Sequence, residues 1–166
     1  MELPRMDIEE FNGNFFNLIG SDWMLITAGT QDSWNTMTAS WGGFGVLWHK
    51  NVSFCFIRDT RYTFEFMNTH DLYTLTFFEE KYRKALDYCG SHSGRDVDKA
   101  AETGLTPVTI DGSVSFEQAR MVMVCRKLYY QDFDPANFVD PQIHSNYENK
   151  DYHRVYVGEI IASYAR

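Results

Sequence analysis

The chain has 166 residues, of which 44% are apolar, so it is long enough for one domain with a buried core. Its formal net charge of −8 at pH 7 and its lack of a basic stripe disfavour binding to nucleic-acid phosphates. Three widely spaced cysteines without a C-x-x-C pair argue against a zinc ribbon or a dithiol motif, so no metal is expected. Without an apolar leader or a long apolar run, we expect a cytoplasmic protein that neither crosses nor binds a membrane.

Six segments are rich in β-branched and aromatic residues, which is typical of strands. The longest two alternate apolar side chains with a period of two, as half-buried strands do. The second segment is expected to end at the glycine-rich run 42–45. In chain order, the predicted strands are residues 23–30, 37–41, 52–57, 72–78, 118–131 and 153–164.

Three short helices are expected between the strands. Residues 62–68 form the first, with Thr60 as its N-cap. Residues 82–89 repeat apolar side chains at helical spacing, and Gly90 is expected to follow this helix at its C-terminus. Residues 97–104 form the third helix. Because strands and helices do not alternate strictly, the pattern favours an antiparallel sheet or barrel with peripheral helices over a doubly wound sheet.

Residues 90–99 are small, polar and charged. Ser93 precedes Asp96 by three residues, as in a capping box, and this spacing predicts the start of the third helix. The free amides of a helix start, together with nearby cations and hydroxyls, suit a phosphate. An ordinary helix–helix turn explains the same residues equally well. The candidate phosphate ligands are Ser91, Ser93, Arg95 and Lys99.

Residues 58–63 follow a predicted strand directly and open a predicted helix. Two arginines and two threonines at such a junction also suit an oxyanion. The alternative is a surface turn whose arginines pair with nearby carboxylates. The candidate ligands are Arg58, Thr60, Arg61 and Thr63.

Residues 35–41 combine small and hydroxyl side chains on one short strand. Small side chains let a flat ligand approach the backbone closely. Aromatic residues make up 16% of the chain, which indicates either a β-rich core or a surface for a planar ligand. An edge strand with ordinary threonine and serine alternation is the alternative. The candidate ligand-binding residues are Thr36, Met37, Thr38, Ala39, Ser40 and Trp41.

Several common catalytic motifs are missing from the sequence. It has no complete G-x-G-x-x-G, no P-loop and no nucleophile elbow, and its histidines lack zinc-ligand spacing. No residue is therefore assigned as a catalytic acid or base. Cys89, at the end of a helix whose dipole raises a thiol pKa, is expected to be unreactive. His153 is expected to be a strand residue with a structural hydrogen bond, and a proton relay is the alternative.

Residues 35–41, 58–63 and 89–99, with the stretch 153–160, resemble the flavin reductase-like, FMN-binding family, in the branch that includes flavoredoxin. The similarity extends from about residue 23 to residue 161. It implies a mainly β fold, an antiparallel split β-barrel with a few short peripheral helices, formed by residues 1–166 as a single domain. It also implies a homodimer with FMN near the subunit interface. Residues 133–151 have no clear counterpart, so a lid, a partner-specific arm and a plain loop all remain open.

The same resemblance implies roles for the three segments. Residues 37–41 would line the isoalloxazine ring and the ribityl chain. The arginines and threonines of residues 58–63 would flank the flavin and its phosphate, and the serines and cations of residues 91–99 would complete the phosphate site.

The implied function is that of an NAD(P)H:flavin reductase-like oxidoreductase with bound FMN. The second hypothesis is a flavoredoxin-type electron carrier that serves a redox protein partner. The third is a barrel that binds another planar, phosphate-bearing ligand. Because the sequence contains no Rossmann segment that would mark a nicotinamide site, NADH or NADPH remains a possible electron donor only.

Overall fold

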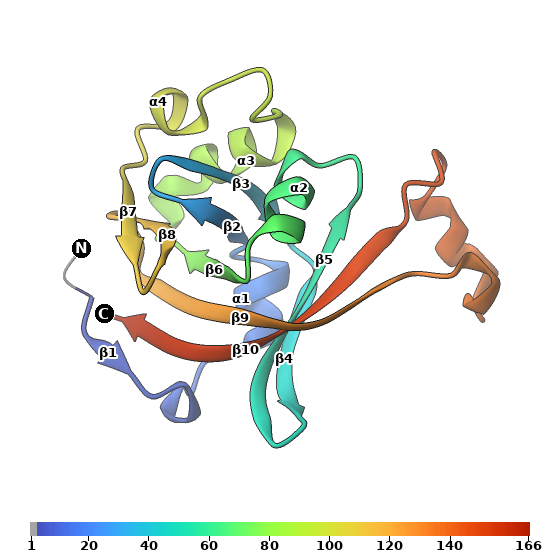
Figure 1. The fold of residues 1–166 in the computed structure, drawn as a ribbon, viewed down its shortest axis with the longest axis horizontal. Coiled ribbons are helices and arrows are strands. Elements are labelled where there is room, and N and C mark those ends of the chain that lie inside the picture. Colours follow the sequence, from blue (N-terminus) through green and yellow to red (C-terminus); the bar gives the residue numbers. More distant parts are fainter. Residues whose placement is uncertain (1–2) are drawn as a thin grey trace.

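The computed structural model describes residues 3–166 and is dominated by an antiparallel sheet of eight strands (Figure 1). The order along the sheet is β3-β2-β6-β9-β10-β5-β4, and β1 pairs with the far end of β10. Two further strands, β7 and β8, form a separate hairpin. The strands are β1 (Arg5–Met6), β2 (Met24–Thr30), β3 (Ser33–Ala39), β4 (Gly42–Leu47), β5 (Lys50–Arg58), β6 (Leu72–Phe77), β7 (Pro107–Ile110), β8 (Ser113–Phe116), β9 (Met121–Asp132) and β10 (His153–Ala165).

Residues 3–166 also contain four short α-helices and four 3-10 helices, of which η3 and η4 lie in the connection between β9 and β10. Among residues 3–166, no helix is long and apolar enough to cross a membrane. The mainly β, antiparallel split-barrel fold expected from the sequence is confirmed. The helices are η1 (Ile8–Glu10), α1 (Phe15–Gly20), α2 (Tyr62–Thr69), η2 (Glu80–Tyr82), α3 (Arg83–Ser91), α4 (Lys99–Thr103), η3 (Pro135–Asn137) and η4 (Pro141–Asn146).

Strand β2 separates two apolar cores. Its side chains alternate between the two faces of the sheet, so Ile26 and Ala28 enter the main core inside the barrel. Leu25 enters the second core, beneath α3, where it joins Leu86 and Cys89. Both faces of β2 are therefore covered, which explains why its first six residues are all buried.

The six predicted strands are confirmed, and two of their boundaries are instructive. Strand β3 begins at Ser33, because it forms a tight hairpin with β2 in which Ser33 pairs with Thr30. The strand predicted before the glycine-rich run 42–45 does end there, at Ala39, but the run itself was not predicted to be a strand. The run belongs to β4, in which Gly42 pairs with Cys55 and Gly45 pairs with Val52 of the antiparallel strand β5. Pairing with a long neighbour outweighs the weak strand propensity of glycine.

Two helix boundaries also differ from the prediction. Arg61, and not Thr60, is the N-cap residue of α2. Gly90 does not end α3, which continues to Ser91. A Cβ atom at Gly90 would lie 3.2 Å from Cβ of Thr38. This glycine therefore serves the close approach of α3 to β3 and not helix termination.

The predicted capping box at Ser93 and Asp96 is wrong. These residues form a turn in which the Asp96 amide donates to the Ser93 carbonyl at 3.0 Å. Helix α4 begins after Asp98, whose carboxylate accepts from the amides of Ala100 and Ala101. The helix is therefore shorter than expected. It ends as predicted at Gly104, which adopts the left-handed conformation with φ of 70°.

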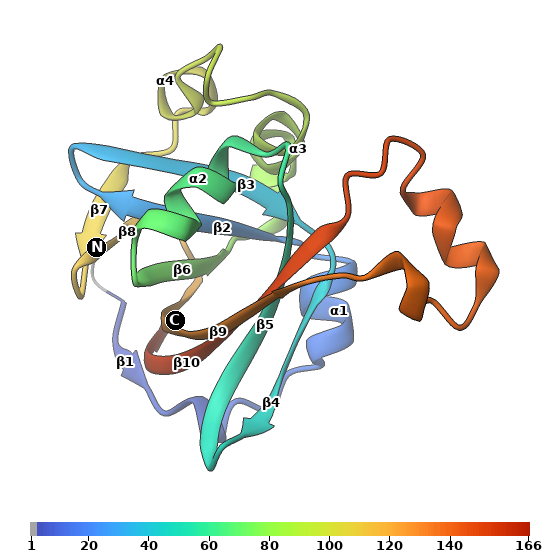
Figure 2. The ribbon, with the colours of Figure 1, turned by 45° about the vertical axis from the view of Figure 1, so that its right-hand side comes forward.

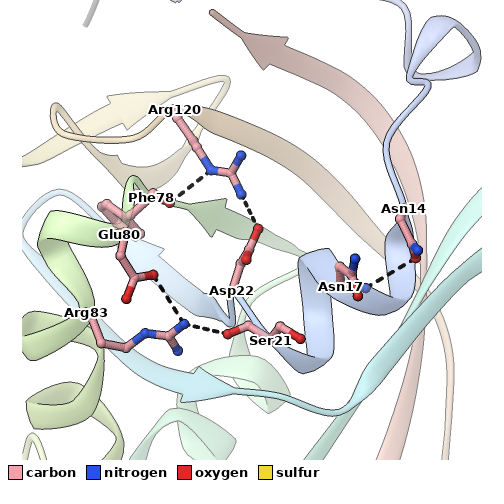
Figure 3. A network of polar contacts seen from close by, with 8 residues as sticks. All are labelled: Asn14, Asn17, Ser21, Asp22, Phe78, Glu80, Arg83 and Arg120. Atoms are coloured by element: carbon pink, nitrogen blue, oxygen red, sulfur yellow. Dashed lines mark hydrogen bonds and ion pairs between the residues drawn. The ribbon is translucent and has the colours of Figure 1, made fainter.

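A polar network fixes the start of α3 to the barrel (Figure 3). Arg120 donates to the Phe78 carbonyl at 2.9 Å and to the Asp22 carboxylate at 2.6 Å. Arg83, the first residue of α3, donates to the Ser21 carbonyl at 2.5 Å. These bonds join the end of α1, the entry to β2 and the connection between β6 and α3. They help to hold α3 where its last turn contacts β3.

Residues 133–152, which connect β9 to β10, project away from the barrel in both views (Figures 1 and 2). We call this segment the arm. The ring of Phe138 stacks on Tyr147 at 5.7 Å, which gives the arm a small aromatic cluster of its own. The Phe133 amide donates to the His153 carbonyl at 2.9 Å, so the base of the arm continues the β9–β10 ladder.

Candidate functional site

Two adjoining cavities, of about 220 and 260 Å³, follow β3 and share Met37 and Arg61. We call them together the β3 groove. Residues at its Trp41 end are Met37, Thr38, Ala39, Ser40, Trp41, Phe56, Arg58, Arg61, Gly90 and His153. Residues at its Lys99 end are Asn35, Met37, Thr60, Arg61, Tyr62, Thr63, Ser91, His92, Ser93, Gly94 and Lys99.

The Trp41 end has a floor of small side chains and an aromatic edge. Thr38 is held by α3, because its hydroxyl donates to the Leu86 carbonyl. Gly90 keeps the last turn of α3 close to the floor. Trp41 is 48% exposed, and its ring lies 5.4 Å from the ring of His153. This end of the groove is therefore shaped for a flat group.

His153 is only 7% exposed and is held by the arm. Its Nδ1 atom and the Tyr147 hydroxyl are 2.6 Å apart. Burial, reinforced by the nearby Arg58 cation and opposed by Asp151, lowers the pKa of His153 to about 4. The imidazole is therefore neutral at neutral pH, and it makes the structural hydrogen bond expected for it.

This pKa shift predicts an acid-sensitive fold. The His153 pKa falls from the ordinary value of 6.5 to about 4 on folding, so the unfolded chain binds the extra proton first. We expect the free energy of unfolding to decrease as the pH falls from about 6.5 to about 4, measured by urea denaturation. His153→Gln should show a shallower decrease over this interval. Parallel curves for the two proteins would contradict the assignment.

Arg58 links the groove to the arm. Its guanidinium pairs with the Asp151 carboxylate at 2.9 Å and donates to the Asn146 carbonyl at 3.0 Å. It also lies over the Tyr147 ring, 4.9 Å from its centroid. The guanidinium of Arg58 therefore mainly contacts the arm. For Arg58, this agrees with the alternative interpretation of residues 58–63, in which the arginines pair with nearby carboxylates.

Asp151→Asn tests this link. The two side chains of the ion pair are 24% and 17% exposed, so the substitution removes a partly buried attraction that anchors the arm. We expect cleavage by a protease within residues 133–150 to accelerate several-fold, with little change in the unfolding midpoint of the barrel. Glu148→Gln, at an exposed carboxylate of the same arm, is the matched control and should leave the cleavage rate unchanged.

Two cations, Arg61 and Lys99, line the Lys99 end of the groove. Arg61 donates to the Gly90 carbonyl at 3.0 Å, and burial together with the Arg58 charge lowers its pKa. Arg61 is the N-cap residue of α2 without a side-chain capping bond, and Tyr62 and Thr63, which begin this eight-residue helix, line the groove. Positive charge beside the N-terminus of a helix suits an anion.

Lys99 is 5% exposed, although the sequence places it in a polar loop. Its ammonium group donates to the carbonyls of Thr36 at 2.7 Å and Cys89 at 2.8 Å. Burial lowers the Lys99 pKa to about 8. The side chain ties the start of α4 to β3 and still lines the groove, where its charge adds to that of Arg61.

Two of the predicted site residues do not line the β3 groove. Thr36 is buried in β3, where its hydroxyl lies 2.8 Å from that of Thr27. Arg95 pairs with Glu65 and lies over the Tyr62 ring at 4.7 Å. The other predicted residues meet in the groove: Met37, Thr38, Ala39, Ser40, Trp41, Arg58, Thr60, Arg61, Thr63, Ser91, Ser93 and Lys99.

Sequence reasoning did not assign Phe56, Gly90 or Gly94 to the groove. A Cβ atom at Gly94 would lie 1.9 Å from the Asn35 side-chain oxygen, so any larger residue there requires the Asn35 side chain to move. The aromatic alternation of the strand before Arg58 was the available signal for Phe56. Cys89 is buried, and burial raises its pKa to about 11 against the opposing Lys99 charge, which agrees with the expected lack of reactivity.

The fold and the groove define a split-barrel protein with a site suited to a flat ligand that carries an anionic group. Residues 16–165 match the family model described as the flavin reductase like domain. The match covers most of the chain, and the protein belongs to this family.

Solved structures with the same fold have low sequence identity to this chain. An FMN-binding domain of a flavin reductase-like enzyme from Shewanella baltica has a TM-score of 0.71 and 14% identity, over 98% of this chain and 76% of that one. Flavoredoxin from Methanosarcina acetivorans has a TM-score of 0.70 and 21% identity, over 97% and 76%. An NADH:FAD oxidoreductase from Streptomyces globisporus has a TM-score of 0.65 and 16% identity, over 87% and 75%. No match was found among curated protein sequences.

Proposed function

We propose that the protein is an FMN-binding oxidoreductase that binds its flavin in the β3 groove. The main support is the continuity of the groove: a floor of small side chains leads through Met37 and Arg61 to a cavity lined by Lys99. FMN has the matching order of parts, with a flat tricyclic ring at one end and a phosphate at the other. The donor set fits the phosphate, since Arg61, Lys99 and the uncapped start of α2 supply charge and amides.

FMN would supply the redox chemistry once bound, and the chain would supply binding and electrostatics. Arg61 and Lys99 would hold the phosphate. The β3 backbone would support the ring, and Trp41 would cover one edge of it. His153, neutral and tied to Tyr147, would add no charge beside the ring. This division of labour needs no dedicated acid–base pair.

We propose NADH or NADPH as the electron donor. The structural similarity to an NADH:FAD oxidoreductase favours this assignment. The similarity to a flavoredoxin favours the second candidate, an electron carrier that exchanges electrons with a protein partner. The two candidates differ in one measurable property, which is direct reduction by a free nicotinamide.

We also propose that the chain is a single domain that works as a homodimer. Large apolar side chains are exposed on the β4–β5 hairpin and on the neighbouring strand and arm. Exposed apolar surface of this kind is typical of a protein–protein interface. The side chains are Val46, Trp48, Tyr129, Tyr130 and Val139. Light scattering at several protein concentrations should give twice the chain mass.

Titration of the purified protein with FMN and with riboflavin tests the cofactor. We expect near-stoichiometric FMN binding, and much weaker binding of riboflavin, which lacks the phosphate. Anaerobic addition of NADH or NADPH should then bleach the flavin absorbance if the protein is a reductase. Bleaching only after addition of a reduced protein donor would favour the carrier. Equal affinities for FMN and riboflavin would contradict the phosphate site.

A further inference from the structure

A further cavity of about 540 Å³ adjoins the Trp41 end of the β3 groove. We call it the aromatic pocket. It lies between α1 and the start of β4, and it shares Ser40, Trp41 and Phe56 with the groove. Its volume falls within the range of about 300–1,000 Å³ that is typical of small-molecule sites. None of the residues assigned to the flavin phosphate lies in it.

The lining of the aromatic pocket is uncharged throughout. The wall is rigid on one side, because the Phe15 ring packs against Phe11 at 4.9 Å and against Phe44 at 4.8 Å. Two large apolar side chains at the rim of the pocket are exposed to solvent, Phe16 at 90% and Trp41 at 48%. Such rings gain stability when a ligand covers them.

The uncharged lining of the aromatic pocket disfavours ligands that carry a charge. Burying an unpaired phosphate, sulfonate or carboxylate against phenylalanine is strongly unfavourable. The pocket therefore does not suit the pyrophosphate of a dinucleotide. A neutral flat ring system, by contrast, can pack against Phe15, Phe44 and Trp41 in offset or edge-to-face contacts.

We propose that the aromatic pocket binds a neutral, flat, apolar electron acceptor of the quinone class. This inference rests on the proposed function, because the shared Trp41 and Phe56 would place such a molecule beside the flavin ring. A quinone there would take up the two electrons and two protons that reduced FMN releases, and it would leave as the hydroquinone. The binding step itself requires no flavin and can be measured separately.

Equilibrium dialysis with a matched pair of ligands tests the class. We use 2-methyl-1,4-naphthoquinone as the neutral ligand and 1,4-naphthoquinone-2-sulfonate as its anionic counterpart. The neutral quinone should bind at least about tenfold more tightly. Saturating FMN should not displace the quinone, because the two ligands would occupy different cavities.

Gly20→Leu locates the quinone site. Gly20 lines the pocket, and a Cβ atom there meets no heavy atom within 4 Å, so leucine can enter the space without strain. We expect quinone binding to weaken roughly tenfold and FMN binding to remain unchanged. Gly20→Ala is the matched control, with the same gain in helix propensity and little added volume. Phe16→Asp, at an exposed rim position, should weaken quinone binding without disturbing the core.

The possible outcomes separate this proposal from the proposed function. Stoichiometric displacement of the quinone by FMN would overturn it, because the pocket would then belong to the flavin site. Unchanged quinone affinity in both Gly20→Leu and Phe16→Asp would also overturn it, as would a change of oligomeric mass in these variants, which would assign the pocket to a second copy. Loss of FMN binding with quinone binding intact would instead overturn the proposed function.

Discussion

Arg61→Ala is expected to weaken FMN binding by about tenfold to a hundredfold, because it removes a charge-assisted contact worth roughly 1.5–3 kcal/mol. Arg61 is the one cation shared by both cavities of the β3 groove, and its pKa is lowered by burial and by Arg58. Riboflavin affinity should change by less than about threefold, since this ligand has no phosphate. Isothermal titration of both ligands measures the ratio.

Arg95→Ala is the matched control for this experiment. Arg95 pairs with Glu65 and stacks on Tyr62, outside the groove, so FMN affinity should change by less than about twofold. Arg61→Lys should recover part of the affinity, because it restores the charge without the planar donor geometry. An equal loss on Arg95→Ala would instead support the assignment of Arg95 to the phosphate that the sequence resemblance implies.

Gly158→Ala is expected to destabilise the fold by about 3 kcal/mol, at the upper end of the usual range for overpacking. A Cβ atom at Gly158 would lie 2.1 Å from the hydroxyl oxygen and 2.7 Å from Cζ of Tyr73. Tyr73 is fully buried, and its hydroxyl lies 2.7 Å from the Ser53 hydroxyl. The ring cannot retreat without breaking that bond, so the strain remains in the barrel.

Urea denaturation measures this loss of stability. Gly45→Ala is the control in β4, two strands away in the same sheet, where a Cβ atom would meet Phe54 at an ordinary 3.7 Å. The stability of this variant should change by less than about 0.5 kcal/mol. Tyr73→Phe should lower stability by about 1–2 kcal/mol, because Ser53 loses a buried partner. The double variant Tyr73→Phe/Gly158→Ala should be more stable than the sum of the two losses predicts. Simple additivity would show that the two residues do not clash.

The strand pattern was readable because it is local. Alternation of apolar side chains along 122–128 and 155–161 reflects which face of the same strand is buried, and this property repeats every two residues. Glycine at a helix end was equally readable at Gly104, where φ is positive. The prediction from glycine was wrong at Gly90. Glycine is needed there because Thr38 packs closely against it, and the helix does not end at this residue.

The candidate ligand-binding segments could be predicted from their residue types. The hydrogen-bond and ion-pair partners of their side chains could not. Residues 37–41 have hydroxyl and small side chains, and residues 58–63 include two cations. These residue types suit any flat anionic ligand, so they can be identified as candidates from the sequence before the fold is known. It could not show that Lys99 donates to the Thr36 carbonyl, 63 residues away, or that Arg95 turns to Glu65. Those contacts depend on how α3, α4 and β3 pack together.

The sequence by itself determined six of the ten strands in residues 3–166, the antiparallel class and the residue types of the candidate site, because each follows from neighbours along the chain. Only the tertiary structure decided which cations face the groove, that Arg58 belongs to the arm, and that an uncharged aromatic pocket adjoins Trp41. The physical reason is that burial and the choice of partner are set by segments distant in sequence. The residue type gives the charge of a side chain, whereas the tertiary structure determines which group that charge contacts.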